Sequence, residues 1–169
     1  MSFNNIKTKM KSEHGFTIVE LLIVIVVIGI LAAITIVAYN GVTARANATS
    51  SRAAANSFAK KAEIYNADGG QNRYPLVATE LTTGPSTTTF FLTGVTANYA
   101  GPIVTAAPAV NNTVRVAKCA AGTPVNQAAI VATNITGLSI YAWDYSANAE
   151  AAAISVGANT GSTTTCPLT

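Results

Sequence analysis

The feature that most constrains this chain is an apolar run near its amino end. Residues 16–38 include only one charged side chain, that of Glu20. As an α-helix rising about 1.5 Å per residue, this run would span roughly 34 Å, enough to cross a bilayer core of about 30 Å. The run therefore predicts a membrane-spanning helix over residues 16–38.

The residues before this run differ from an ordinary secretory signal. A secretory signal has its small-residue cleavage site after the apolar core, whereas the small residue here, Gly15, precedes the core. A basic flank comes first, Phe16 follows the glycine, and Glu20 lies five residues after it. Together with the Gly-Ile-Leu-Ala-Ala-Ile run at residues 29–34, this pattern resembles the prepilin signal of type IV pilins and pseudopilins.

The resemblance implies that the chain is processed. In this family a prepilin peptidase cuts after the glycine, here Gly15, and methylates the new amino terminus, here Phe16. The leader would be residues 1–15, and its three lysines would hold it on the cytoplasmic side, so that residues beyond about 40 are translocated outward. The alternative is an uncleaved signal anchor.

Glu20 is the residue expected to control assembly. A carboxylate in an apolar helix is costly and is usually retained for a partner. In the family that partner is the positive amino terminus of a neighbouring subunit, here Phe16, and the pairing selects one packing register. A local role is the alternative, because residues 17–20 fit a capping box and a first-turn acid favours the helix dipole. The two roles are compatible.

Gly29 is expected to serve helix packing. Glycine weakens a helix but lets neighbouring helices approach closely. In many type IV pilins the stretch between this glycine and a proline eight residues later loses its helical structure inside the filament. Val37 stands at that later position here, which puts such melting in doubt and favours a straighter helix.

The helical signal continues beyond the membrane. Residues 39–66 contain no proline and one glycine, are rich in alanine and carry spaced charges, so they predict an amphipathic continuation of the helix. Glycines at 69 and 70 and Pro75 should end it. Apolar or small residues at a rough spacing of three to four predict one buried stripe, formed by Val42, Ala46, Thr49, Ala53, Phe58, Ala62 and Tyr65.

A β-rich globular head is expected over residues 67–169. Short runs rich in β-branched residues, separated by turn residues, predict strands near residues 88–92, 113–119, 138–145 and 152–156. The expected fold class is α+β, with the long amino-terminal helix packed against a small antiparallel sheet.

Cys119 and Cys166 are the only cysteines. Both fall in the part expected outside the cell, where one disulfide is permitted. Such a bond would resemble the disulfide-bounded loop near the end of many pilins. The alternative is two unpaired, buried cysteines.

Charge and composition give no support to an enzyme or a nucleic-acid-binding protein. The formal net charge is +3, but the leader accounts for +2 of it, which leaves +1 for residues 16–169. Arg115 and Lys118 would suit DNA only if they clustered with Arg73 on one exposed face. The single histidine, His14, lies in the leader, so processing would remove any histidine-based catalytic or metal site. We expect no enzymatic activity, cofactor or metal.

The expected function is that of a pilus subunit. The resemblance implies a major pilin that waits in the cytoplasmic membrane and is extracted into a homo-oligomeric helical filament by a cytoplasmic ATPase and a polytopic platform protein. The extracellular pilus would support adhesion, motility or DNA uptake. The alternatives are a pseudopilin of a type II secretion or competence system and a minor priming or adhesive pilin.

Overall fold

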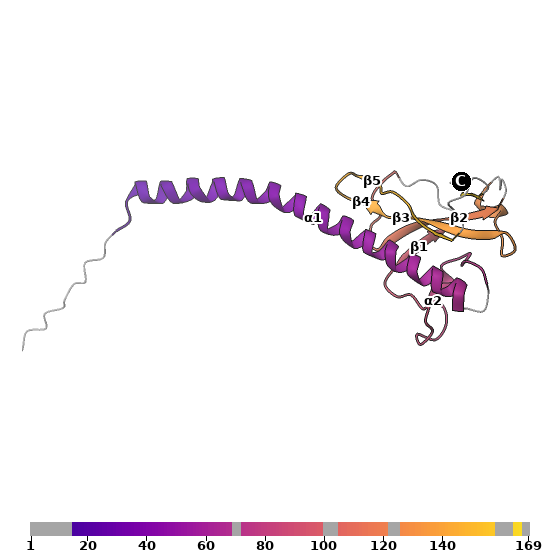
Figure 1. The fold of residues 1–169 in the computed structure, drawn as a ribbon. Helices are drawn as coiled ribbons and strands as arrows, with labels where there is room; N and C mark the ends of the chain where they lie inside the picture. Colours follow the sequence, from indigo (N-terminus) through magenta and orange to yellow (C-terminus); the bar gives the residue numbers. More distant parts are fainter. Residues whose placement is uncertain (1–14, 69–71, 100–104, 122–125, 158–163, 167–169) are drawn as a thin grey trace, which may run out of the picture. The chain divides into compact units, whose positions relative to one another are not determined.

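The computed structural model describes residues 15–68, 72–99, 105–121, 126–157 and 164–166. Contacts divide the chain into two compact units, residues 1–40 and 41–169, and each is described by itself. The long helix α1, Ile18–Asp68, contributes to both units. The fold is α+β as expected, because the second half of α1 packs against a small sheet (Figure 1).

In the first unit α1 begins at Ile18, two residues after the expected start. The helix continues without interruption through Gly29 and Val37, and every residue from 15 to 40 is exposed. It is long and apolar enough to cross a membrane. A helix that is apolar on all sides and uncovered by its own chain requires an apolar environment from outside.

In the second unit one face of α1 is buried in the head. The buried positions recur every three or four residues, at Ser51, Ala54, Ala55, Phe58, Ala59, Ala62 and Tyr65. The expected stripe is right from Phe58 onward and wrong before it, since Val42, Ala46, Thr49 and Ala53 are exposed. The first fully buried residue of α1 is Ser51, a polar residue that a hydrophobic periodicity does not select.

The main sheet has the strand order β1-β2-β3-β6, with β7 paired to the carboxyl end of β2. Its strands are β1 (Thr96–Tyr99), β2 (Thr113–Ala121), β3 (Ile135–Tyr141), β6 (Ile154–Gly157) and β7 (Thr164–Thr165). One core cluster joins the apolar residues of the stripe of α1 to side chains of β2 and β3, namely Val114, Val116, Leu138 and Ile140.

The sheet is mixed rather than purely antiparallel. Three of its four pairings are antiparallel as expected, but β1 pairs with β2 in parallel, with Thr96 opposite Thr113. A parallel pair needs a crossover of roughly a dozen residues or more, and the segment 100–112 between the two strands is long enough.

The strand expected over residues 88–92 is wrong, because this segment forms turns. It follows the short helix α2, Thr79–Thr82, and the Leu92 amide donates a hydrogen bond to the Leu81 carbonyl at 2.8 Å. Phe90 nevertheless contacts Tyr65 edge-on, and Leu92 is buried. The apolar residues of this segment therefore serve the core from turns.

The strand expected over residues 138–145 is interrupted at Ala142. β4 (Trp143–Asp144) leaves the main sheet and pairs with β5 (Ala149–Glu150) in a separate hairpin. At the break, the Trp143 amide donates to the Ser51 hydroxyl of α1 at 3.0 Å. The other two expected strands are confirmed as β2 and, displaced by one or two residues, β6.

A glutamine side chain completes the edge of β2 between β1 and β7. Gln127, in the 3₁₀ helix Gln127–Ala129, accepts a hydrogen bond from the Lys118 amide at 2.7 Å and donates one to the Lys118 carbonyl at 3.0 Å. Both backbone groups of this strand residue are thus satisfied by one buried side chain, as a neighbouring strand would satisfy them.

Tyr74 and the edge strand β6 are fastened to α1 through Glu63. The carboxylate accepts from the Tyr74 hydroxyl at 3.0 Å and from the Gly157 amide at 3.2 Å. Gly157 has a φ of +77°, and a Cβ there would lie 2.5 Å from the Tyr74 ring, so the close approach requires glycine. Burial and the bond to Glu63 raise the pKa of Tyr74 to about 12.

Candidate functional site

The candidate site begins at the amino end of α1. Residues 15–17 lie outside the helix, and the Phe16 side chain is 86% exposed. A Cβ built on Gly15 would have no atom within 4 Å. The Gly15–Phe16 peptide bond therefore lies in non-helical, accessible backbone, which is where proteases cut most readily.

Thr17 and Glu20 form a reciprocal capping box. The Glu20 amide donates to the Thr17 hydroxyl at 3.2 Å, and Glu20 Oε2 accepts from the Thr17 amide at 2.9 Å and from its hydroxyl at 2.7 Å. These bonds satisfy donors that have no partner within the first turn of the helix. The local role expected for Glu20 is therefore present in the structure.

The capping box occupies only one oxygen of the Glu20 carboxylate. Within the described residues, Oε2 accepts both hydrogen bonds and Oε1 accepts none. The side chain is exposed. An ionised carboxylate can accept several hydrogen bonds, so Glu20 can cap its own helix and still bind a cation through Oε1.

Gly29 lies at an open position on the helix surface. A Cβ built on it would meet nothing within 4 Å, so the packing of its own chain gives no reason for glycine. The missing side chain leaves room for another helix to approach.

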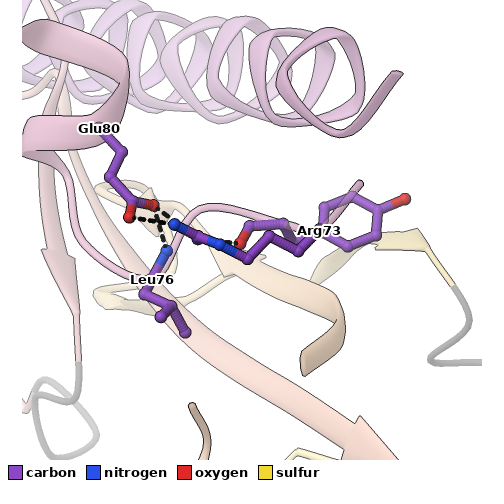
Figure 2. Close-up of polar contacts among 4 residues, drawn as sticks. Arg73, Leu76 and Glu80 are labelled. Carbon is purple, nitrogen blue, oxygen red and sulfur yellow. Dashed lines mark hydrogen bonds and ion pairs between the residues drawn. The ribbon is translucent and has the colours of Figure 1, made fainter. Parts of the chain in front are cut away.

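Tyr74 and Pro75 follow the helix in a turn held by an ion pair between Arg73 and Glu80. Figure 2 shows the paired side chains, joined by bonds of 2.8 and 3.1 Å, with the Leu76 amide donating to the same carboxylate at 2.8 Å. Burial works to raise the pKa of Glu80, but the bonds from Arg73 and Leu76 and the charge of Arg73 outweigh it, so the pKa is lowered.

The basic residues considered for DNA do not form an exposed cluster. Arg115 is 4% exposed, lies over the Tyr141 ring and is paired with Glu150 at 2.6 Å. Arg73 is paired with Glu80, and the half-buried Lys118 donates to a backbone carbonyl. The condition that the sequence set for DNA binding is therefore not met.

Cys119 and Cys166 are joined in a disulfide, which confirms the pairing expected from the sequence. Cys119 is fully buried on β2, and Cys166 directly follows β7. The bond fastens β7 to the strand with which it pairs. In the described part of the chain, no three His, Cys, Asp or Glu residues are grouped so that they could hold a metal ion.

Sequence reasoning missed Ser51, Gln127 and Glu80 as fastening residues. The signal for Glu80 was present, since Arg73 and Glu80 flank a Tyr-Pro turn at a short spacing. Ser51 and Gln127 gave no local signal, because a buried polar residue is recognised only by its partner.

Comparisons with known proteins agree with the amino-terminal pattern and extend beyond it. The family model described as a prokaryotic N-terminal methylation motif matches residues 10–36. The type IV wide pilus major component PilA4 of Thermus thermophilus is 37% identical over 92 residues, which cover 53% of this chain and 70% of that protein.

Two fimbrial proteins of Pseudomonas aeruginosa are each 55% identical over 40 residues. These matches cover 24% of this chain and only 26% of either fimbrial protein. No solved structure matches the chain.

Proposed function

Because the chain belongs to the type IV pilin family, we propose that it is a major pilin, the structural subunit of an extracellular pilus, and not an enzyme. The match to a major pilus component of Thermus thermophilus carries this proposal. It extends over 92 residues, far beyond the methylation motif at residues 10–36 that pseudopilins and minor pilins also share. Similarity outside the motif to a major pilus component supports a major pilin over those two alternatives.

The proposed organisation follows from the processing signal. A prepilin peptidase removes residues 1–15 as the leader and methylates the new amino terminus, Phe16. Residues 16–38 span the cytoplasmic membrane before assembly and lie in the filament core afterwards, and residues 39–66 connect them to the head at 67–169. The exposed, non-helical backbone at Gly15 supports cleavage there.

Charge pairing at Glu20 is the proposed basis of subunit selection. The amine of Phe16 on a neighbouring subunit would bind the unoccupied Oε1 of Glu20, while Oε2 keeps its bonds to Thr17. Burying two opposite charges is favourable only if they pair in good geometry. A misplaced subunit would leave both charges buried and unpaired, which is strongly unfavourable. Gly29 would let the helices pack closely around this pair.

Assembly moves an apolar helix from lipid to a bundle of similar helices. Such a transfer gains little from the hydrophobic effect, because lipid tails are as apolar as the helices. We therefore assign the work of extraction to a cytoplasmic ATPase acting through a polytopic platform protein. The pilus would support adhesion, motility or DNA uptake, and for uptake the three basic residues of the head do not provide a DNA-binding face.

The proposal is tested by deleting the gene and by identifying the protein of the surface filaments. We expect filaments to disappear on deletion, to return on complementation, and to contain this chain as the most abundant protein by mass spectrometry. Filaments that persist without the chain would contradict the proposal. A chain found only at trace levels in the filaments would identify a minor pilin, and a chain found only in the cell envelope would identify a pseudopilin.

A further inference from the structure

We infer that Tyr39 is an anchor at the outward-facing interface of the cytoplasmic membrane. Glu20 marks the cytoplasmic boundary of the same membrane span. This inference rests on the proposed membrane-inserted precursor and specifies how deeply its helix lies in the bilayer. The partner of Tyr39 is the headgroup region of the bilayer.

The spacing of the two residues matches the thickness of a bilayer. No charged residue lies between Glu20 and Tyr39, and both belong to the uninterrupted helical segment of the first unit. They are nineteen positions apart, a rise of about 28 Å at 1.5 Å per residue, against a hydrocarbon core of about 30 Å. An upright helix therefore places both residues at interfaces at once.

The outer end has the chemistry of an interfacial anchor. The Tyr39 ring is 71% exposed and lines one shallow groove of the helix with Thr35, Ile36 and Asn40. Helical side chains lean toward the preceding turn, so the Tyr39 ring lies over the last apolar turn of the span, directly before the polar Asn40. Tyrosine is enriched at this depth because one part of it is apolar and another is polar.

The polar residue just inside this boundary is compatible with lipid. The Thr35 hydroxyl donates to the Ala32 carbonyl at 2.9 Å, so its hydrogen is satisfied within the helix. A satisfied hydroxyl can lie in the hydrocarbon region, whereas an unsatisfied one is costly there. The polar residue Asn40 directly follows Tyr39 and would be the first residue outside the hydrocarbon core.

The same placement explains how an acid is tolerated before assembly. With Tyr39 at the outer interface, Glu20 lies at the inner interface and not at the bilayer centre. A charge is far less costly at an interface than at the centre. The precursor can therefore wait in the membrane with Glu20 ionised and capped by Thr17.

Depth-dependent fluorescence quenching tests the inference on the full chain in lipid vesicles. Tyr39→Trp and Ile30→Trp are compared, using lipids brominated either near the headgroup or at the end of the acyl chain. Ile30 lies nine residues, about 14 Å, before Tyr39 and should be near the midplane. The native Trp143 gives the same background in both variants and is measured in the unsubstituted chain.

We expect Tyr39→Trp to be quenched most by lipids brominated near the headgroup, and Ile30→Trp most by chain-end bromines. If Ile30→Trp is not quenched at all, the membrane-inserted precursor itself is refuted. If Ile30→Trp is quenched deeply but Tyr39→Trp is quenched equally deeply or not at all, only the anchor is refuted. Emission of Tyr39→Trp that changes only on filament formation would assign position 39 to subunit packing instead.

A labelling experiment asks whether the phenol sets the depth. Asn40→Cys is combined with Tyr39→Leu or, as the aromatic control, with Tyr39→Trp, and is exposed to a membrane-impermeant maleimide from the outer side. The native disulfide does not react. We expect Tyr39→Leu to slow the labelling, because a longer apolar run draws position 40 inward, and Tyr39→Trp to leave the rate unchanged. Equal rates in the two variants would overturn the anchoring role.

Discussion

At the residue scale, Thr17 and Glu20 allow helix capping to be separated from charge pairing. Glu20→Gln keeps an oxygen that can accept from Thr17 but removes the charge, whereas Thr17→Ala removes the capping hydroxyl and keeps the charge. We expect processed Glu20→Gln to accumulate in the membrane without surface filaments, because it leaves the amine of Phe16 unpaired. Thr17→Ala should still form filaments. Electron microscopy and immunoblots of membrane fractions measure both.

The opposite result would reverse the assignment. If Glu20→Gln gives normal filament yield with the variant confirmed inside the filaments, charge pairing is not required. If Thr17→Ala alone abolishes filaments, capping is the essential role.

A second residue-scale prediction concerns Ser51, whose hydroxyl accepts from the Trp143 amide. Ser51→Ala should lower the free energy of unfolding by about 1–3 kcal/mol, because the buried amide loses its acceptor. The neighbouring Ser50 is exposed, so Ser50→Ala should change stability by no more than about 0.5 kcal/mol. Urea unfolding of the full chain in detergent compares the two. Equal effects would show that the hydrogen bond is not stabilising.

At the element scale, the Arg73–Glu80 ion pair should make the turn after α1 sensitive to acid. The folded state lowers the pKa of Glu80 below its ordinary value of 4.5, so the associated stability is present above that value. It is lost as the pH falls through the lowered folded pKa, so the free energy of unfolding should decrease as the pH falls below 4.5.

The contribution of Glu80 is obtained from a matched variant. Glu80→Gln should be less stable than the unsubstituted chain at neutral pH, and the difference should shrink as the pH falls, because protonation removes the same charge. The other carboxylates titrate in both proteins and cancel in the comparison. A difference that does not depend on pH would exclude the ion pair as its source.

The disulfide belongs to the same scale, since it fastens β7 to β2 across 47 residues of chain. Replacing both cysteines with alanine should lower the free energy of unfolding by about 4 kcal/mol in the chain-entropy model. Hydrogen exchange of the full chain should show lost protection first at Ala120 and Ala121, which pair with β7. Unchanged protection there, together with exchange first in α1, would contradict this assignment.

At the scale of the whole molecule, we expect only the processed form of the chain, without its leader, to be assembled into filaments. We expect the intact mass of filament subunits to correspond to residues 16–169 with one added methyl group. Gly15→Leu should trap the precursor, because the peptidase must accept the backbone at that position. Gly41→Leu, at a helix position that is equally open, should leave processing normal. Filament subunits that retain residues 1–15 would refute the cleavage.

The amino-acid sequence by itself determined the apolar anchor, the processing pattern around Gly15 and Phe16, the capping box at Glu20 and the long helix. These features depend on hydropathy and on residues a few positions apart, so they can be read locally. The α+β class and the presence of a disulfide were predicted for related reasons, from strand-forming runs and from the only two cysteines.

Only the tertiary structure decided how the head is put together. Four features depend on residues far apart in the chain. They are the register of the buried stripe, the parallel β1–β2 pair, the break at Ala142 and the pairing of Arg115 with Glu150. Ser51 and Trp143, which dock the hairpin onto α1, are 92 positions apart. A local pattern shows that a residue can be buried or paired, but its partner is selected by which surfaces the folded chain brings together.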